Sequence, residues 1–116
     1  MAIILAYADT PAGRAARDFA VEETERRGEE LIVFPVDGSA PDLQEIGCAS
    51  AQLGGPAERS RDAVGDLVDL TMGEQITAVV VGVRRRSPVG KILLGSQAQQ
   101  IILEAGCPVI TVKPQA

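Results

Sequence analysis

Four short apolar runs limit what this chain can fold into. They span residues Ala2–Tyr7, Leu31–Val36, Ala78–Val83 and Pro108–Val112, and apolar side chains follow one another almost without interruption. A strand with one face in water alternates apolar and polar residues, whereas a strand covered on both faces does not. The runs therefore predict parallel strands buried within a layered α/β fold.

Helical patterns separate these runs. The clearest covers Pro11–Arg27, with Thr10 placed as its N-cap and Gly28 where a helix would stop. A second helix is predicted over about residues 58–72, and a third begins at Ser96, which opens a capping-box sequence and is the predicted N-cap. Strands that alternate with helices imply right-handed βαβ units, so we predict an open doubly wound parallel sheet.

Residues 37–56 carry the weakest signals. This segment is rich in Gly, Ser, Ala and Pro, and only a short strand near residues 48–53 is expected there, with no helix. A chain of 116 residues is long enough for one core but not for two. Residues 1–116 are therefore interpreted as a single domain.

Composition argues against several classes of function. A net charge of −5 and a content of one Tyr, two Phe and no Trp disfavour both duplex and single-stranded nucleic acid as partners. The chain has no histidine, which removes the commonest general base and the commonest metal ligand. Cys48 and Cys107 lack metal-ligand spacing and are interpreted as small buried side chains, with their redox state left open. No catalytic residue and no metal site are predicted.

The first residues give the expected location. Met1–Tyr7 has no basic start of a signal peptide, Asp9 follows soon after, and no apolar run approaches the length that spans a membrane. We expect a cytoplasmic protein without a membrane partner.

The segment from Val79 to Ser96 carries the strongest chemical signal. An apolar run ends at Gly82, three arginines follow at Arg84–Arg86, and Gly95 stands before the next helix. Glycines let the backbone come close to a ligand, a helix start offers free N–H groups, and arginine forks match phosphate oxygens. The pattern favours an anion site, although the same residue types also suit a plain strand-to-helix connection. In a doubly wound sheet this segment would face residues 7–10 across a crevice.

This segment resembles the phosphate-binding loop of the universal stress protein family. Nucleotide-binding members carry Gly-x-x-Gly, nine residues, and then Gly-Ser or Gly-Thr after the fourth strand, and Gly82 and Gly95-Ser96 stand at that spacing. Three further segments are similar to the family's opening strand and helix, its second strand and its closing strand, namely Ala6–Ala16, Glu30–Val36 and Gly106–Lys113. The resemblance covers the chain except residues 37–56.

The resemblance implies the strand order 3-2-1-4-5. The segment between the second strand and Glu58 is shorter than usual in the family, so the middle region is expected to be truncated, with its helix reduced or lost and one sheet face thinly covered. The family also implies a role in the stress response or its regulation, and a cytoplasmic homodimer. The dimer would be joined through the last strand, at Val109, Ile110, Thr111 and Val112.

Many members of the family bind ATP, so the resemblance makes ATP, with Mg²⁺, the candidate cofactor. The matched positions and the arginine run together give the candidate ligand-binding residues. These are Ala8, Asp9, Val36, Val81, Gly82, Arg84, Arg85, Arg86, Gly90, Gly95, Ser96 and Gln97.

Three departures from the family pattern leave nucleotide binding open. Ala8 stands at the position of an aspartate, with Asp9 one residue later, and Arg85 and Pro88 stand at positions of glycines. Three functions are therefore kept. The first is a regulatory module that binds an adenine nucleotide or another phosphate-bearing ligand. The second is a dimeric protein that acts through a protein partner and binds no nucleotide. The third, slow ATP hydrolysis, lacks a clear base.

Overall fold

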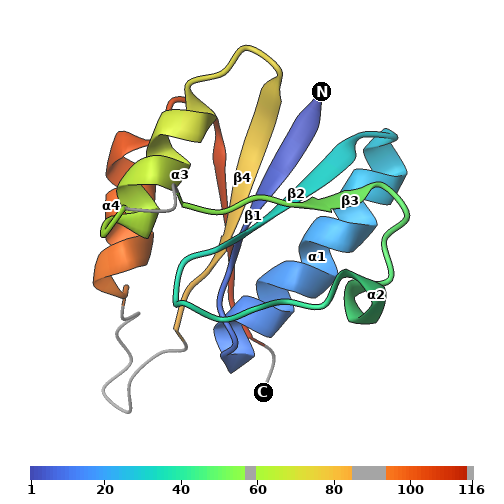
Figure 1. Ribbon diagram of the computed structural model, residues 1–116, viewed down its shortest axis with the longest axis horizontal. Helices are drawn as coiled ribbons and strands as arrows, with labels where there is room; N and C mark the ends of the chain where they lie inside the picture. Colours follow the sequence, from blue (N-terminus) through green and yellow to red (C-terminus); the bar gives the residue numbers. More distant parts are fainter. Residues whose placement is uncertain (57–59, 85–93, 115–116) are drawn as a thin grey trace.

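The computed structural model describes residues 1–56, 60–84 and 94–114. A five-stranded parallel sheet runs through them in the order β3-β2-β1-β4-β5 (Figure 1). The strands are β1 (Ala2–Tyr7), β2 (Glu30–Pro35), β3 (Ala51–Leu53), β4 (Ile76–Gly82) and β5 (Val109–Val112). The predicted doubly wound parallel sheet and its strand order are confirmed. The ends of β2, β4 and β5 differ from the prediction by one or two residues.

Four helices cover the sheet, two on each face (Figure 1). They are α1 (Pro11–Arg27), α2 (Leu43–Ile46), α3 (Ala63–Thr71) and α4 (Ser96–Glu104). Right-handed connections toward the β3 edge place α1 and α2 on one face, and connections toward the β5 edge place α3 and α4 on the other. The crossover directions change at β1, which leaves the carboxyl ends of β1 and β4 uncovered between α1 and α4.

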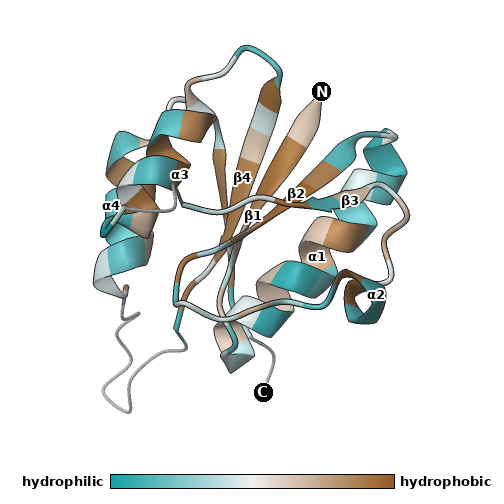
Figure 2. Cartoon of the chain, in the orientation of Figure 1, coloured by the Kyte–Doolittle hydropathy of each residue, from teal (hydrophilic) through white to brown (hydrophobic). Residues whose placement is uncertain are grey.

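Continuous apolar strands arise because both faces of the sheet are buried. Along β1, Ile3 and Leu5 pack into the cluster under α1, whereas Ile4 and Ala6 pack into the cluster under α3 and α4. Ile3, Ile4 and Leu5 are all 0% exposed. Figure 2 shows the same layering, with apolar strands between helices whose outer surfaces are largely polar. No helix in the described parts of the chain has the length and apolar character that a membrane span needs.

The bounds of α1 are as predicted, and those of α3 are not. The Thr10 hydroxyl accepts a hydrogen bond from the Gly13 N–H (2.9 Å), and Gly28 ends α1 with φ 68°. Helix α3 was expected to begin near residue 58, which lies outside the described residues, but it begins at Ala63. The reason is local, because the Asp62 carboxylate accepts from the Gly65 N–H (2.9 Å) and caps the helix there.

The middle region contains a one-turn helix, which agrees with the reduced helix implied by the family resemblance but for which the residue pattern gave no signal. Helix α2 is a single turn, capped by Asp42 and ended by Gly47 with φ 70°, and one turn is too short to show a helical period. The expected short strand is confirmed as β3, although it starts three residues later than predicted, at Ala51. Cys48 is buried beside it, Cys107 is half-buried, and both thiols are free.

The central strands are covered on the face under α1 and α2 although the helix in the middle region is a single turn, whereas at the β3 edge Leu53 is 58% exposed, in line with the expected thin cover. On the face under α1 and α2, the side chains from the three central strands are completely buried, because α1 spans them and α2 closes the rest with Leu43 and Ile46. These buried side chains are Ile3, Leu5, Leu31, Val33 and Val80.

The first turn of α1 makes backbone-to-backbone contact with the ends of β1 and β4. A Cβ atom added at Gly13 would overlap the carbonyl oxygen of Ala8, and one added at Gly82 would overlap the carbonyl oxygen of Ala12. Glycine is required at both positions by this close approach and not by an unusual φ angle. The contact fixes the start of α1 at the carboxyl ends of the two strands.

We expect Gly13→Ala to lower the free energy of unfolding by about 1–3 kcal/mol, because the new methyl group forces two backbones apart. An alanine in a helix would otherwise stabilise it by up to about 1 kcal/mol, so the sign of the change is informative. Urea unfolding measures the effect. Gly55→Ala is the matched control, since nothing lies within 4 Å of a Cβ atom at Gly55. A Gly13→Ala variant as stable as the control would contradict this account of the contact.

Candidate functional site

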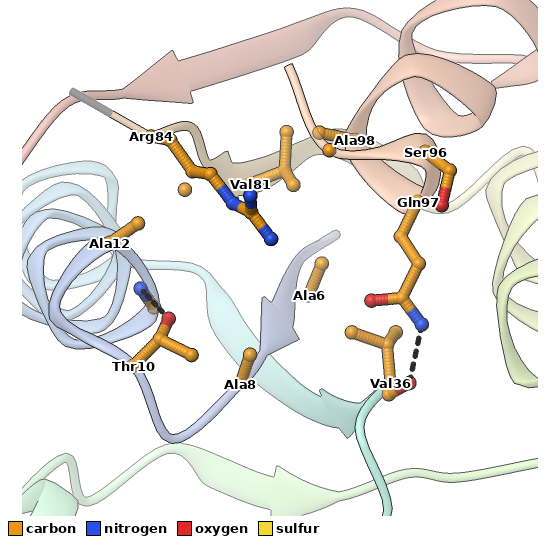
Figure 3. A pocket seen from close by; sticks show the side chains of 13 residues that line it. Ala6, Ala8, Thr10, Ala12, Val36, Val81, Arg84, Ser96, Gln97 and Ala98 are labelled. Atoms are coloured by element: carbon orange, nitrogen blue, oxygen red, sulfur yellow. Dashed lines mark hydrogen bonds between the residues drawn. The ribbon is translucent and has the colours of Figure 1, made fainter. Parts of the chain in front are cut away.

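A pocket of about 300 Å³ lies beyond the carboxyl ends of β1 and β4, where the crossover direction changes (Figure 3). This volume is at the lower end of the range for small-molecule sites. Residues from five segments line it: Ala6, Ala8, Thr10, Ala12, Gly13, Val36, Val81, Gly82, Arg84, Gly95, Ser96, Gln97 and Ala98.

Eight of the twelve predicted site residues line this pocket. They are Ala8, Val36, Val81, Gly82, Arg84, Gly95, Ser96 and Gln97. Three others, Arg85, Arg86 and Gly90, lie outside the described residues. The structure therefore brings together segments after β1, β2 and β4 and at the start of α4, as expected where parallel strands end at one edge of a sheet.

Asp9 is the predicted residue that the structure places elsewhere. Its carboxylate accepts a hydrogen bond from Arg14 (3.1 Å), and its side chain does not line the pocket. Ala8, one residue earlier, faces the pocket with a methyl group. The floor of the pocket is accordingly apolar, formed by Ala6, Ala8, Val36 and Val81 (Figure 3).

The start of α4 differs from the prediction in a way that matters for the site. Ser96 was the predicted N-cap, but it is the first helical residue, and Gly95, which has no side chain, is the N-cap. Among the described residues no side chain caps this helix, and the Gly95 carbonyl accepts from the Gln99 N–H (3.0 Å). The predicted capping box is therefore wrong.

Because α4 starts without a side-chain cap among the described residues, backbone N–H donors are free in its first turn. Within the described residues, the N–H groups of Ser96, Gln97 and Ala98 have no hydrogen-bond partner, and all three residues line the pocket. The first N–H groups of a helix carry its positive partial charge and bind anions readily. The start of α1 also borders the pocket, but there Thr10 already caps the Gly13 N–H.

Arg84 adds a full positive charge on the opposite side. It lies two residues after the end of β4, and its guanidinium extends over the pocket above Ala6 (Figure 3). Among the described residues it has no acidic partner. An arginine without an ion pair, beside an uncapped helix start, makes this end of the sheet attractive to a phosphate group.

Five lining residues were not among the candidate site residues, namely Ala6, Thr10, Ala12, Gly13 and Ala98, although Thr10 belongs to residues 7–10, which were expected to face the crevice. Thr10, Ala12 and Gly13 reach the pocket because the first turn of α1 contacts β4 at Gly82. Small side chains carry no chemical signal in the sequence. Thr10 was recognised as a helix cap, and its place beside a ligand site depends on the packing of α1.

Comparisons with known proteins agree with this architecture. The model of the Universal stress protein family matches residues 55–113. A universal stress protein of Mycolicibacterium smegmatis is 36% identical, and the alignment covers 97% of each chain. A solved universal stress protein from Archaeoglobus fulgidus has a TM-score of 0.72 at 26% identity, covering 97% of both chains. A structure from the same organism in complex with dAMP has a TM-score of 0.66 at 22% identity, with coverage of 97% of this chain and 96% of that chain.

Asp37 holds the loop between β1 and α1 against the end of β2. Its carboxylate accepts hydrogen bonds from the backbone N–H of Asp9 (2.8 Å), from the backbone N–H of Ser39 (3.0 Å) and from the Ser39 hydroxyl. Partial burial by itself raises the pKa of Asp37, but these hydrogen bonds outweigh it, so its pKa lies below the usual range. Asp37 thus supports the segment that brings Ala8 and Thr10 to the pocket.

The lowered pKa gives a pH dependence with a definite sign. Ionised Asp37 stabilises the fold above about pH 4, the range in which an unfolded aspartate titrates, and this contribution is lost as the pH falls through the lower folded pKa. We expect Asp37→Asn to be less stable than the natural chain at pH 7, with the difference shrinking below about pH 4. Urea unfolding at several pH values measures it. Asp18→Asn, which removes an exposed carboxylate from α1, is the control. A constant difference down to pH 2 would contradict this role.

Proposed function

The chain belongs to the universal stress protein family, and we propose that it is a regulatory module that binds an adenine nucleotide in this pocket. The observation that carries the proposal is the start of α4, which faces the pocket together with Arg84; among the described residues no side chain caps this helix and no acidic group pairs with Arg84. The complex of a structural relative with dAMP supports an adenine nucleotide as the anion.

The phosphate would lie between Arg84 and the first turn of α4. Arg84 supplies a planar donor fork, and the N–H groups of Ser96, Gln97 and Ala98 supply backbone donors. The base would lie over the apolar floor near Val36 and Val81, where burial of a flat ring favours binding.

Ala8, whose side chain is a methyl group, stands at the position where nucleotide-binding members of the family carry an aspartate. The ribose therefore has no carboxylate from this position, and binding depends more on the phosphate and the base. None of the described lining residues is acidic, so we propose that Mg²⁺ enters only as part of a Mg²⁺–nucleotide complex. None of these lining residues is a general base, and the proposed role is binding and not turnover.

Arg84→Ala is expected to weaken AMP and ATP binding by about 10- to 100-fold, because a charge-assisted hydrogen bond contributes about 1.5–3 kcal/mol. Calorimetric titration at low and high salt measures the loss, with and without Mg²⁺. The salt dependence should be smaller in the variant, since one phosphate contact is missing.

Arg26→Ala is the matched control. It removes the same charge from the last turn of α1, at the opposite end of the helix from the pocket. Equal losses in the two variants would indicate a general charge effect and contradict the site. If the natural chain binds no nucleotide under any condition, the module acts through a protein partner instead.

We also propose that the protein is a homodimer joined at β5, the strand at one edge of the sheet. The Val79 N–H donates to the Pro108 carbonyl (3.0 Å) and the Val83 N–H to the Val112 carbonyl (2.9 Å). Because backbone groups alternate along a strand, those of Val109 and Thr111 point toward the open edge. An apolar edge strand of this kind favours pairing with a second strand.

Thr111→Lys should convert the dimer to a monomer, because it places two like charges near each other across the paired strands. Sedimentation velocity measures the change. Gln52→Lys, on the exposed strand β3 at the other edge of the sheet, is the matched control and should leave the dimer intact. A natural chain that sediments as a monomer, or a Gln52→Lys variant that dissociates, would contradict pairing through β5.

A further inference from the structure

Gln97 connects two walls of the pocket. It is the second residue of α4, and its Nε2 donates a hydrogen bond to the backbone carbonyl of Val36, just after β2, over 2.8 Å (Figure 3). The Val36 N–H donates in turn to the Tyr7 carbonyl (2.9 Å), so the acceptor is anchored to the end of β1. The side chain of Gln97 is therefore held in place across the mouth of the pocket.

Chemistry fixes which way the amide is turned. A backbone carbonyl can only accept a hydrogen bond, so the NH₂ group must face Val36 and the Oε1 oxygen must face away from it. Figure 3 shows this oxygen directed toward the middle of the pocket. Among the described residues no group donates to Oε1, and Gln97 remains exposed, so a ligand can reach it.

The pocket thus has two unlike sides. Arg84 and Gln97 approach from opposite sides of Ala6, the first with a positive charge and the second with an oriented neutral acceptor (Figure 3). A phosphate matches the guanidinium, whereas a carboxamide oxygen repels a phosphate and matches an N–H donor. Glutamine amides pair with adenine in this way, accepting from its amino group and donating to the adjacent ring nitrogen.

We propose that Gln97 is a specificity-determining residue whose Oε1 accepts a hydrogen bond from the amino group of the adenine base. The proposal rests on the proposed function, because it names how that same pocket recognises its nucleotide. The hydrogen bond to Val36 is then a positioning contact that presents the acceptor before the ligand arrives.

Purine riboside 5′-monophosphate is the appropriate probe, because it differs from AMP only in lacking the amino group. The full chain should bind AMP about tenfold more tightly than this analogue, since the analogue leaves the amide oxygen without a donor. Gln97→Met keeps the length of the side chain and removes both the amide oxygen and the amide NH₂ group. It should bind the two nucleotides with equal affinity.

Gln99→Met is the matched control, with the same substitution at an exposed residue of the same helix that does not line the pocket; it should keep the tenfold preference. If Gln97 served only to tie α4 to β2, Gln97→Met would weaken both nucleotides in parallel and leave their ratio unchanged, which overturns the proposal. A natural chain that binds AMP and the analogue equally also overturns it.

Adenosine separates this result from a failure of the proposed function. Tight AMP and weak adenosine binding, with no preference for AMP over the analogue, would leave the phosphate site standing and reject the role of Gln97. No binding of AMP at all would reject both. Thermal unfolding of the Gln97→Met variant, compared with Gln99→Met, reports whether the loss of the Val36 hydrogen bond has altered the fold.

Discussion

The contact between the first turn of α1 and the ends of β1 and β4 is the constraint on which the site depends. At Gly13 and Gly82 the backbones approach so closely that neither position has room for a Cβ atom. The contact brings Thr10 to the edge of the pocket, beside the strand ends that carry Ala8 and Arg84. Without it, the crossover would still leave a crevice at this place, but its walls would be farther apart and less well defined.

The two helices that border the pocket begin in different ways. The Thr10 hydroxyl caps the Gly13 N–H in the first turn of α1, whereas α4 has Gly95 as its N-cap, and within the described residues three N–H groups of its first turn have no partner. A glycine at the N-cap position stabilises a helix less than a capping side chain does, by only about a few tenths of a kcal/mol, and a bound anion can supply the hydrogen bonds that the missing side chain would have made. This difference in capping, together with Arg84, gives the pocket a preference for negative charge although the chain as a whole has a net charge of −5.

Ala8, which stands in place of the family's aspartate, and Gln97 together determine which segments offer polar groups to the pocket. The segment after β1 offers the pocket a methyl group, and the nearby Asp9 is engaged with Arg14. In the proposed binding mode, polar recognition would therefore come from Arg84, after β4, and from Gln97 on α4, both of which line the pocket. Both belong to the part of the chain that matches the family model, while the shortened middle region contributes a single helical turn away from the pocket. The proposed function thus places the ligand at the family's position and assigns its recognition to different groups.

The sequence by itself determined the strands, the three longer helices and the position of the candidate site, because apolar runs and helix caps such as Thr10 are local signals that neighbouring residues suffice to read. It could not determine that Ser96 leaves the cap position to Gly95, since a capping box and an uncapped start differ only in backbone angles. Helix α2 left no signal in the residue pattern, because a single turn is too short to show a helical period. The bond between Gln97 and Val36 joins residues 61 positions apart. Such a contact is decided only when β2 and α4 come together at one edge of the sheet, because no local pattern encodes which distant carbonyl a side chain will meet.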